Sequence, residues 1–389
     1  MSLNSVTLTA AVRQNLLSLQ GTADLLATTQ ERLATGKKVN SALDNPTNFF
    51  TAAGLDARAS DISNLLDSIG NGVQVLQAAN TGITSLSSLV DTAKSIANQV
   101  LQQPSGFSTK STSTSSVALG GTAANLVDGA TIKAGETLSF AASGSLPALT
   151  VTFGASESLA QLNTALAAGG LSASLDSNNN LVITTTNDAA GSTIGAITPG
   201  GTAGSATFSL GTAPVADAVS QATRANLVAQ YNQILTQITT TAQDSSFNGI
   251  NLLNGDSLKL VFDETGKSSV TIAGVTFNPA GLGLSSLTAG TDFIDNNTTN
   301  NVLTALNNAS VTLRAQASAF GANLSIVQIR QDFNKNLINV LQTGSANLTL
   351  ADSNEEAANS QALSTRQSIA TSALALANQS QQNVLQLLR

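Results

Sequence analysis

The sequence predicts a mainly α-helical protein that carries an inserted α+β domain. Helical periodicity of the apolar residues fills residues 1–103 and 215–389, whereas residues 104–214 carry short strand-like runs between Gly-rich and Ser/Thr-rich stretches. Two further strand-like runs flank DETGK (263–267) and predict a β-hairpin within the second helical part. At 389 residues, the chain is long enough for two or three domains with cores of their own.

The first helix is predicted from a narrow apolar stripe. Its members recur in steps of four and three and end with one step of seven: Val12, Leu16, Leu19, Ala23, Leu26 and Leu33. This spacing is typical of a coiled-coil seam. The pattern breaks near Gly36, and GKKVNSALDNP (36–46) predicts a loop that Pro46 closes. Within reach of this loop, Asp44 and Arg58 are candidates for an ordinary surface ion pair.

A second, much longer helix is predicted from this loop to about Leu101. Its buried stripe comprises Ile62, Leu65, Ile69, Val73, Leu76, Ala79, Ile83, Leu86, Val90, Ala93, Ala97 and Val100. At about 1.5 Å per residue, ~45 residues make a rod of roughly 65–70 Å. A helix of that length needs a partner along its whole length.

The segment after Pro104 has a different character. SGFSTKSTSTSS (105–116) is interpreted as a Ser/Thr linker, bare or O-glycosylated. A small α+β domain is then predicted at about 117–212, with a short helix at 156–170. Its strand-like runs are 137–140, 149–153, 171–175 and 181–185.

Helical periodicity returns at about Val215. It is interrupted by SSFNGINLLNG (245–255), whose two Asn-Gly pairs predict turns, and then by the hairpin. The next helical stripe comprises Val302, Leu306, Leu313, Phe320, Leu324, Val327, Leu337 and Leu341. A softer break at 343–353 precedes a final helix whose seam is Ile369, Ala373, Leu376, Ser380, Asn383 and Leu387.

The two terminal helices are poorly built to fold alone. A third of their seam positions are Ala or polar, and ordering some 70 residues costs on the order of 70–140 kcal/mol of backbone entropy. We therefore expect residues 1–40 and 350–389 to be disordered in the monomer and to fold when many copies pack together. The alternative is an intramolecular two-helix stalk.

Composition excludes most enzyme chemistry. The chain has no His and no Cys, so it has no Ser-His-Asp or Cys-His site, no His- or Cys-ligated metal and no disulfide. A carboxylate-only hydrolase remains formally possible. The charge balance of 16 Lys and Arg against 23 Asp and Glu argues against nucleic acid and against anionic membrane surfaces. No apolar run approaches a membrane span.

Two short motifs have plain interpretations. DSNNN (176–180) begins like a Ca²⁺ loop, but Leu181 stands where that loop needs Gly and Asn187 where it needs Glu, so a turn is favoured. MSLNSVTLTAAVRQ lacks a basic region followed by an apolar one, so we expect no Sec signal. We expect neither a metal nor a cofactor, and no enzymatic activity.

Four segments together resemble bacterial flagellin. These are ERLATGKKVNSALDNP (31–46), NTGITSLSSLVDTAKSIANQ (80–99), QYNQILTQITTTAQDSSFNGINLLNG (230–255) and LALANQSQQNVLQLLR (374–389). The resemblance covers about 1–103 and 215–389. A weaker one relates 156–197 to a small module found inside flagellins and hook-associated proteins.

The resemblance implies a structural subunit of the extracellular flagellar filament, exported through the flagellar type III apparatus. Residues 1–40 and 350–389 would form an inner coiled coil, 41–103 and 215–349 a helical core with the hairpin, and 104–214 an outer variable domain. The implied partners are further copies of the chain or sister flagellins, an export chaperone, the filament cap and the hook-associated junction protein. In the flagellins compared, the outer domain is usually inserted after the hairpin; here 104–214 separates the two core helices instead, and is expected to be dispensable for secretion and polymerisation.

Residue roles follow from the same resemblance. Leu16, Leu19, Leu26, Leu376, Leu387 and Leu388 are expected to pack the inner coiled coil, and Ile69, Val73, Leu76, Leu313, Phe320 and Leu324 the helical core. The stretch 89–99 aligns with the segment that animal innate flagellin receptors bind in many members. Thr92 and Ser95 stand where those members usually have Arg and Glu, while Lys94 keeps a positive charge, so weak receptor activation is expected.

Two other functions stay open. A hook–filament junction protein shares the termini and the general plan. A secreted carbohydrate-binding or hydrolytic protein, with its site on the inserted domain, belongs to a different class. Its carboxylates, however, are scattered over Asp128, Glu136, Glu157, Asp176 and Asp188.

Overall fold

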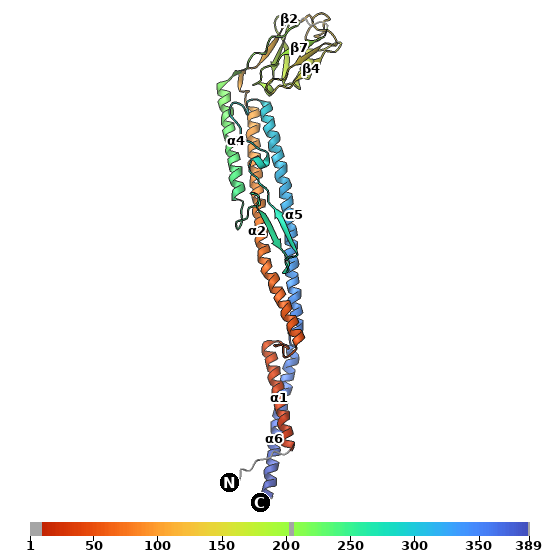
Figure 1. Ribbon diagram of the computed structural model, residues 1–389, viewed down its shortest axis with the longest axis vertical. Helices are drawn as coiled ribbons and strands as arrows, with labels where there is room; N and C mark the ends of the chain where they lie inside the picture. Colours follow the sequence, from red (N-terminus) through yellow and green to blue (C-terminus); the bar gives the residue numbers. More distant parts are fainter. Residues whose placement is uncertain (1–9, 202–205, 388–389) are drawn as a thin grey trace. The chain divides into compact units, whose positions relative to one another are not determined.

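The computed structural model describes residues 10–201 and 206–387 (Figure 1). It confirms the predicted fold class of long helices that carry an inserted α+β domain. The chain divides into two compact units. The first unit comprises Met1–Gly70, Leu260–Val270 and Val327–Arg389, and the second comprises Asn71–Lys259 and Thr271–Ile326.

The first unit contains the two terminal helices, α1 (Ala10–Thr35) and α6 (Ser353–Leu387). It also contains the start of α2 (Pro46–Gln102) and the end of α5 (Asn296–Thr349). Asn45 begins α2 by accepting a hydrogen bond from the Asn48 backbone, and Pro46 occupies the first helical position, where its missing N–H costs nothing. A small apolar cluster joins α2 to α5 through Ala59, Ile62 and Leu341.

The segments that connect these helices in the first unit are themselves paired. Gly36 ends α1 with a φ of 69°, a conformation that an L side chain rarely adopts. Beyond it, the N–H of Lys38 donates to the carbonyl of Thr349 over 2.7 Å, and the N–H of Ala351 donates back to Gly36 over 3.0 Å. The predicted loop and the predicted softer break therefore lie side by side.

The suggested pair between Asp44 and Arg58 is wrong. The carboxylate of Asp44 accepts the backbone N–H groups of Ser41 and Asn40, and these bonds lower its pKa. Arg58 Nε instead lies 2.6 Å from Oε1 of Glu264, at the tip of the hairpin. Local sequence patterns could not predict this pair, because its two residues are more than two hundred positions apart.

In the second unit, α4 (Ala218–Asp244) buries the face that carries Leu227, Val228, Tyr231, Leu235, Ile238 and Ala242. Tyr231 on this face packs edge-to-face on Phe293, with ring centroids 5.9 Å apart. After the helix, Phe247 and Ile250 exchange backbone hydrogen bonds across a two-residue turn. Positive φ angles of 49° at Asn248 and 79° at Gly249 match the type I′ turn that Asn-Gly predicts. The predicted hairpin is formed by β9 (Ser257–Val261) and β10 (Ser269–Ala273).

The inserted domain contains two three-stranded antiparallel sheets. The first has the order β2-β6-β5, formed by Thr112–Ala118, Asn180–Thr185 and Leu171–Leu175. The second has the order β4-β3-β7, formed by Leu149–Thr152, Thr137–Phe140 and Ile197–Gly200. Both sheets and the short helix α3 (Leu159–Ala167) contribute to one apolar core. A capping box between Ser158 and Gln161 begins α3.

The interpretation of 105–116 as a linker is wrong. β1 (Phe107–Thr109) pairs with β8 (Val215–Ala216), and β2 begins at Thr112. Ser111, Ser113 and Ser115 are buried in the domain. Their hydroxyls bond backbone groups of Ile194, Ser209, Val117 and Leu181, so hydrogen bonding replaces the apolar side chains by which a strand is usually recognised. These three hydroxyls are unavailable for the O-glycosylation that the sequence left open.

The turn interpretation of 176–180 is confirmed. Asp176 Oδ1 accepts the backbone N–H groups of Asn178 and Asn180, each over 2.8 Å, and Asn179 has a φ of 63°. Among the residues that the structure describes, no three His, Cys, Asp or Glu side chains gather as metal ligands would.

Candidate functional site: the paired terminal helices

The terminal helices α1 and α6 lie against each other in the first unit (Figure 1). On α1, Val12, Thr22 and Thr29 are buried, whereas Leu19 and Leu26 are half-buried. Two of these buried positions are threonines seven residues apart, so the contact is narrow and partly polar. The seam therefore follows the predicted heptad spacing and keeps several of its predicted members, whereas Leu16 and Leu33 are exposed.

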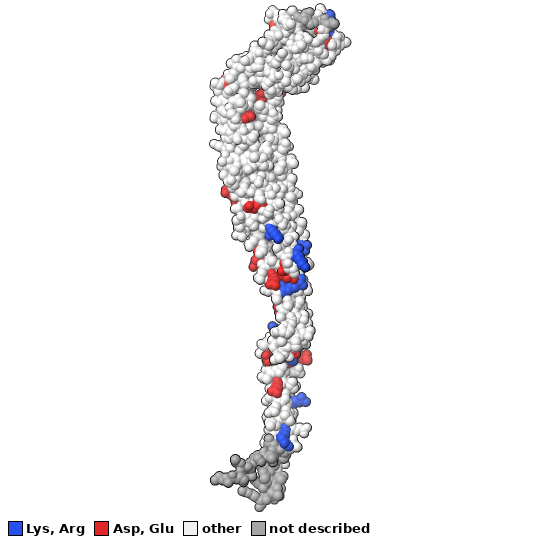
Figure 2. All heavy atoms as spheres, in the orientation of Figure 1, with Lys and Arg blue, Asp and Glu red and all other residues white. Residues whose placement is uncertain are grey.

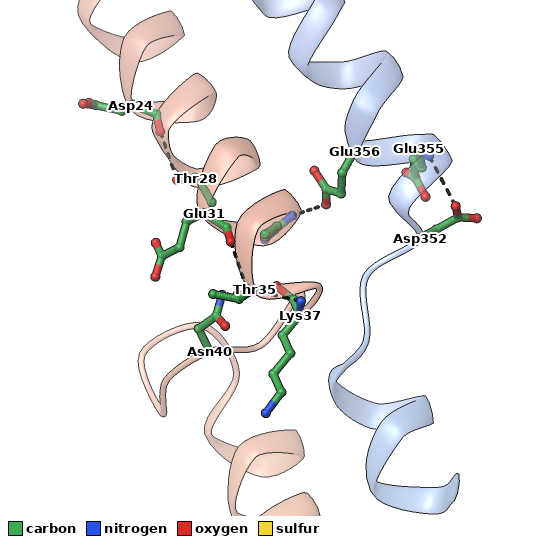
Figure 3. A network of polar contacts seen from close by, with 10 residues as sticks. Asp24, Thr28, Glu31, Thr35, Lys37, Asn40, Asp352, Glu355 and Glu356 are labelled. Atoms are coloured by element: carbon green, nitrogen blue, oxygen red, sulfur yellow. Dashed lines mark hydrogen bonds and ion pairs between the residues drawn. The ribbon is translucent and has the colours of Figure 1, made fainter.

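An ion pair holds the two helices together where α6 begins. Arg32 Nη1 donates to Oε1 of Glu356 over 3.1 Å, and the glutamate side chain is only 9% exposed (Figure 3). Asp352 begins α6 by accepting the backbone N–H groups of Asn354 and Glu355. Two glutamates in the first turn also complement the positive end of the helix dipole.

A groove of about 500 Å³ runs beside this ion pair, between the two helices. Leu25, Leu363 and Ile369 give it an apolar lining, with Arg32, Glu356 and Arg366 at its polar edge. Groove and ion pair together form a surface with both apolar and charged character, which suits a protein partner.

Within the described part of the chain, several large apolar side chains on the terminal helices are exposed. Leu16 is 36% exposed and Leu376 is 69% exposed, and Leu17, Leu25, Leu33 and Ile369 are exposed as well. The side chain of Leu387 and the whole of Leu388 lie outside the described residues. Packing of the predicted inner leucines against other copies stays a prediction.

A second exposed apolar stripe runs along the C-terminal part of α5. Ile329, Phe333 and Val340 are all more than half exposed and recur at steps of four and seven, which places them on one helical face. On the face shown in Figure 2, charged side chains are sparse over the second unit, and most of the visible ones lie on the first. Contiguous exposed apolar surface of this kind marks interaction sites.

The residues expected in the helical core lie inside. Ile69, Val73, Leu76, Leu313 and Phe320 are buried, and Leu324 is half-buried. Their role in packing the helical core of an assembled filament stays a prediction.

The segment aligned with receptor-binding sequences lies on α2. Thr92 and Ser95 are exposed. Lys94 Nζ donates to Ser310 Oγ on α5 over 2.6 Å and lies 3.5 Å from Asp91 Oδ1. Its positive charge is therefore already engaged within the chain.

Sequence reasoning missed three residues of the terminal pair, namely Thr22, Thr29 and Glu356. The threonines carry a usable signal, because with Asn15 they continue a second seven-residue spacing beside the leucine stripe. The glutamate carries none, since its partner is 324 residues away. Within residues 10–201 and 206–387, no helix combines the length and the apolar character needed to cross a membrane.

Comparison with known proteins gives matches at both ends of the chain. Residues 5–120 match the bacterial flagellin N-terminal helical region, and residues 292–388 match the bacterial flagellin C-terminal helical region. The two matched regions together span more than half of the chain and contain the whole of α1, α2, α5 and α6.

Individual relatives show the same relationship at modest identity. Flagellin FljM of Caulobacter vibrioides is 29% identical over 164 residues, which cover 42% of this chain and 59% of that protein. Flagellin FljJ of the same organism is 27% identical over 43% of this chain and 61% of that protein. Flagellin A of Rhizobium meliloti is 33% identical over 88 residues, or 23% of this chain and 22% of that one. The chain thus spans about three-fifths of the length of the Caulobacter relatives that it matches. With both terminal helical regions matched in order and paired in the structure, the chain belongs to the bacterial flagellin family.

Proposed function

We propose that this chain is a structural subunit that polymerises into the bacterial flagellar filament and serves swimming motility. The flagellin family is a family of structural proteins rather than enzymes. The observation that carries the proposal is the set of exposed leucines, together with Ile369, on α1 and α6, two helices that lie within the regions matched to the family. A narrow two-helix contact with apolar side chains facing outward is incomplete until further copies cover it.

The contact between copies is proposed to be head-to-tail. Contacts between different surfaces of successive copies do not close on themselves and generate helical filaments. The stripe of Ile329, Phe333 and Val340 offers a second surface for such contacts, separate from the terminal pair. In this arrangement the terminal helices form the inner coiled coil around the channel, the other long helices form the tube wall, and the inserted domain faces outward.

The chain is proposed to leave the cell unfolded, through the flagellar type III apparatus, and to reside in the extracellular filament. A cytosolic chaperone would hold the C-terminal segment, the filament cap would guide addition at the tip, and the hook-associated junction protein would hold the first copies. Sister flagellins are candidates to share the filament. We propose that residues 1–40 and 350–389 are disordered before assembly, which suits this route. If α1 and α6 were already paired, they would have to separate before the chain could be exported.

Neither of the two other functions gains support. The matched relatives are all flagellins, so no observation favours the hook–filament junction alternative. Glycan binding or hydrolysis by the inserted domain would depend on carboxylates that are scattered along its sequence. Asp128 and Asp176, for example, are each occupied in bonding backbone N–H groups of their own loops.

Seeded growth of filaments tests the proposal. Purified chain added to sheared filament seeds is expected to elongate them, and Leu376→Asp is expected to stop elongation because it places a charge on a surface that assembly buries. The matched control is Asn378→Asp, a change to the same residue at an exposed polar position about 200° round the helix from Leu376. Chain that fails to elongate any seeds, or normal growth of Leu376→Asp, contradicts the proposed function.

A further inference from the structure

The inserted domain meets the helices of the second unit at a buried polar cluster. Its centre is Arg224 of α4, which is 4% exposed, and Asp295, which is 2% exposed and precedes α5. Ser145 and Ser192 of the inserted domain complete the cluster. We call these four residues the joint.

Arg224 holds three segments of backbone at once. Its Nε donates to the carbonyl of Pro104 over 2.9 Å, one terminal nitrogen donates to Phe293 over 2.6 Å, and the other donates to Gln103 over 3.3 Å. Gln103 and Pro104 directly follow the end of α2, where helix carbonyls lack partners within the helix. The planar fork of a guanidinium can serve three acceptors in fixed directions, which a lysine ammonium cannot do in the same way.

Asp295 connects the same place to the inserted domain. Oδ1 accepts the backbone N–H and the hydroxyl of Thr298 and so begins α5. Oδ2 accepts the hydroxyl of Ser145 over 3.2 Å, and that hydroxyl lies 2.8 Å from Ser192 Oγ. Burial lowers the pKa of Arg224, and the nearby charge of Asp295 opposes that effect.

The surroundings leave little room for movement. A Cβ on Gly191 would lie 3.1 Å from the ring of Phe107, and a Cβ on Gly106 would lie 3.2 Å from Gln221. The N–H of Asp217 donates to the carbonyl of Gly106 over 2.9 Å, so the incoming and outgoing strands are tied together. Asn296 adds a side-chain bond to Asp188 of the inserted domain.

We propose that the joint fixes the direction in which the inserted domain leaves the helices, with Arg224 as its positioning residue. A flexible tether needs none of these bonds, since a Gly- and Ser-rich linker is satisfied by water. Buried polar groups that are fully bonded instead hold one arrangement, because every alternative arrangement leaves some of them unpaired. All copies of the chain then present the inserted domain at one angle, whether or not they assemble.

Distances between spin labels on the free chain test this proposal. The chain has no native Cys, so Asn98→Cys on α2 and Ser174→Cys on β5, both exposed positions of the second unit, accept labels without competition. The parent chain is expected to give one narrow distance distribution. Arg224→Gln and Arg224→Lys are both expected to lose that narrow peak in favour of a broad one, since neither supplies the fork.

Two further variants make the result decisive. Arg314→Gln removes an exposed arginine from α5 of the same unit and is expected to keep the narrow peak. Ser145→Ala removes a single hydroxyl from the joint and keeps the test available if Arg224 variants fail to fold; it is expected to broaden the peak less than Arg224→Gln. A broad distribution in the parent chain overturns the proposal. So does an unchanged narrow peak in folded Arg224→Gln. If the Arg224 variants do not fold, an unchanged peak in Ser145→Ala overturns it, and so does a peak in Arg314→Gln that broadens as much as those of the joint variants.

Discussion

Arg32 and Glu356 form an ion pair of 3.1 Å between helices that stand at opposite ends of the sequence. The pair lies where α6 begins, next to the paired backbone of Lys38 and Thr349. It therefore marks the place at which the two ends of the chain are brought together before they continue as α1 and α6.

Removing the charge of Glu356 is expected to weaken the pairing of α1 with α6. Glu356→Gln leaves Arg32 with a weaker acceptor. Because the Arg32 side chain is 36% exposed, its charged hydrogen bond contributes about 1.5 kcal/mol, the lower end of the range for such bonds. If the pair forms during assembly, the critical concentration for seeded growth should rise about tenfold. Glu355→Gln is the matched control, because it changes an exposed glutamate of the same helical turn. An equal rise in critical concentration for the two variants would contradict a specific role of this ion pair.

The strand pair at the base of the inserted domain shows how that domain can be removed. Thr109 and Val215 are opposite each other in the β1–β8 pair. Replacing residues 110–214 by Asn-Gly should therefore close a two-residue hairpin and leave Gln103, Pro104 and Arg224 in place. The expected result is secretion and filament growth at parental levels, measured by shed filament protein and by electron microscopy. Loss of assembly by a variant whose helices still fold would contradict the outer position proposed for this domain.

Receptor activation is expected to increase when the missing charges are supplied. Thr92→Arg with Ser95→Glu adds two exposed charged groups to α2, and each charge-assisted hydrogen bond contributes about 1.5–3 kcal/mol. Potency in a reporter-cell assay should therefore rise roughly tenfold or more. Ser88→Arg changes an exposed position outside residues 89–99 and should leave potency as it is. High potency of the parent chain, or no gain in the double variant, would contradict the expected weakness of this segment.

Acid is expected to destabilise the inserted domain through Asp128. Burial raises the pKa of this carboxyl, but hydrogen bonds from the backbone N–H groups of Ala130, Ile132 and Thr131 outweigh that effect and lower the pKa from 3.8 to about 2. Because the folded pKa is the lower one, the carboxylate stabilises the domain above pH 3.8 and loses that effect as the pH falls toward 2. Because solvent screens this half-buried carboxylate, the contribution is on the order of 1 kcal/mol. Between pH 3.8 and 2, the midpoint temperature of thermal unfolding should therefore fall more steeply with pH in the parent chain than in Asp128→Asn. Midpoints that fall in parallel in the two chains would contradict this role.

The helices were predictable because their signal is periodic and long. The stripe from Ile62 to Val100 specifies a buried face whatever its partner is, while Pro46 begins the helix and Pro104 follows its end. The Asn-Gly turn at 248–249 was predictable for a local reason as well, since its two positive φ angles suit those residues.

What the sequence could not predict depends on contacts between distant residues. β2 has a buried face of Ser rather than of Val or Ile. It pairs with β6, and Ser113 donates to the carbonyl of Ser209, 96 residues further along the chain. Arg224 has the appearance of an ordinary surface residue on a helix, and its burial follows from three backbone carbonyls that the fold brings to it. The candidate site was predictable as two terminal helices, but not in its seam, because Thr22 replaces Leu16 as a buried residue.

Amide hydrogen exchange of the terminal helices, followed in dilute chain and in filaments grown from seeds, tests the central claim most directly. The account predicts that the amides of α1 and α6 exchange rapidly in the dilute chain and become protected in the filament, while those of α4 are protected in both. Protection of α1 and α6 that is already complete in the dilute chain, with no elongation of seeds, would contradict it.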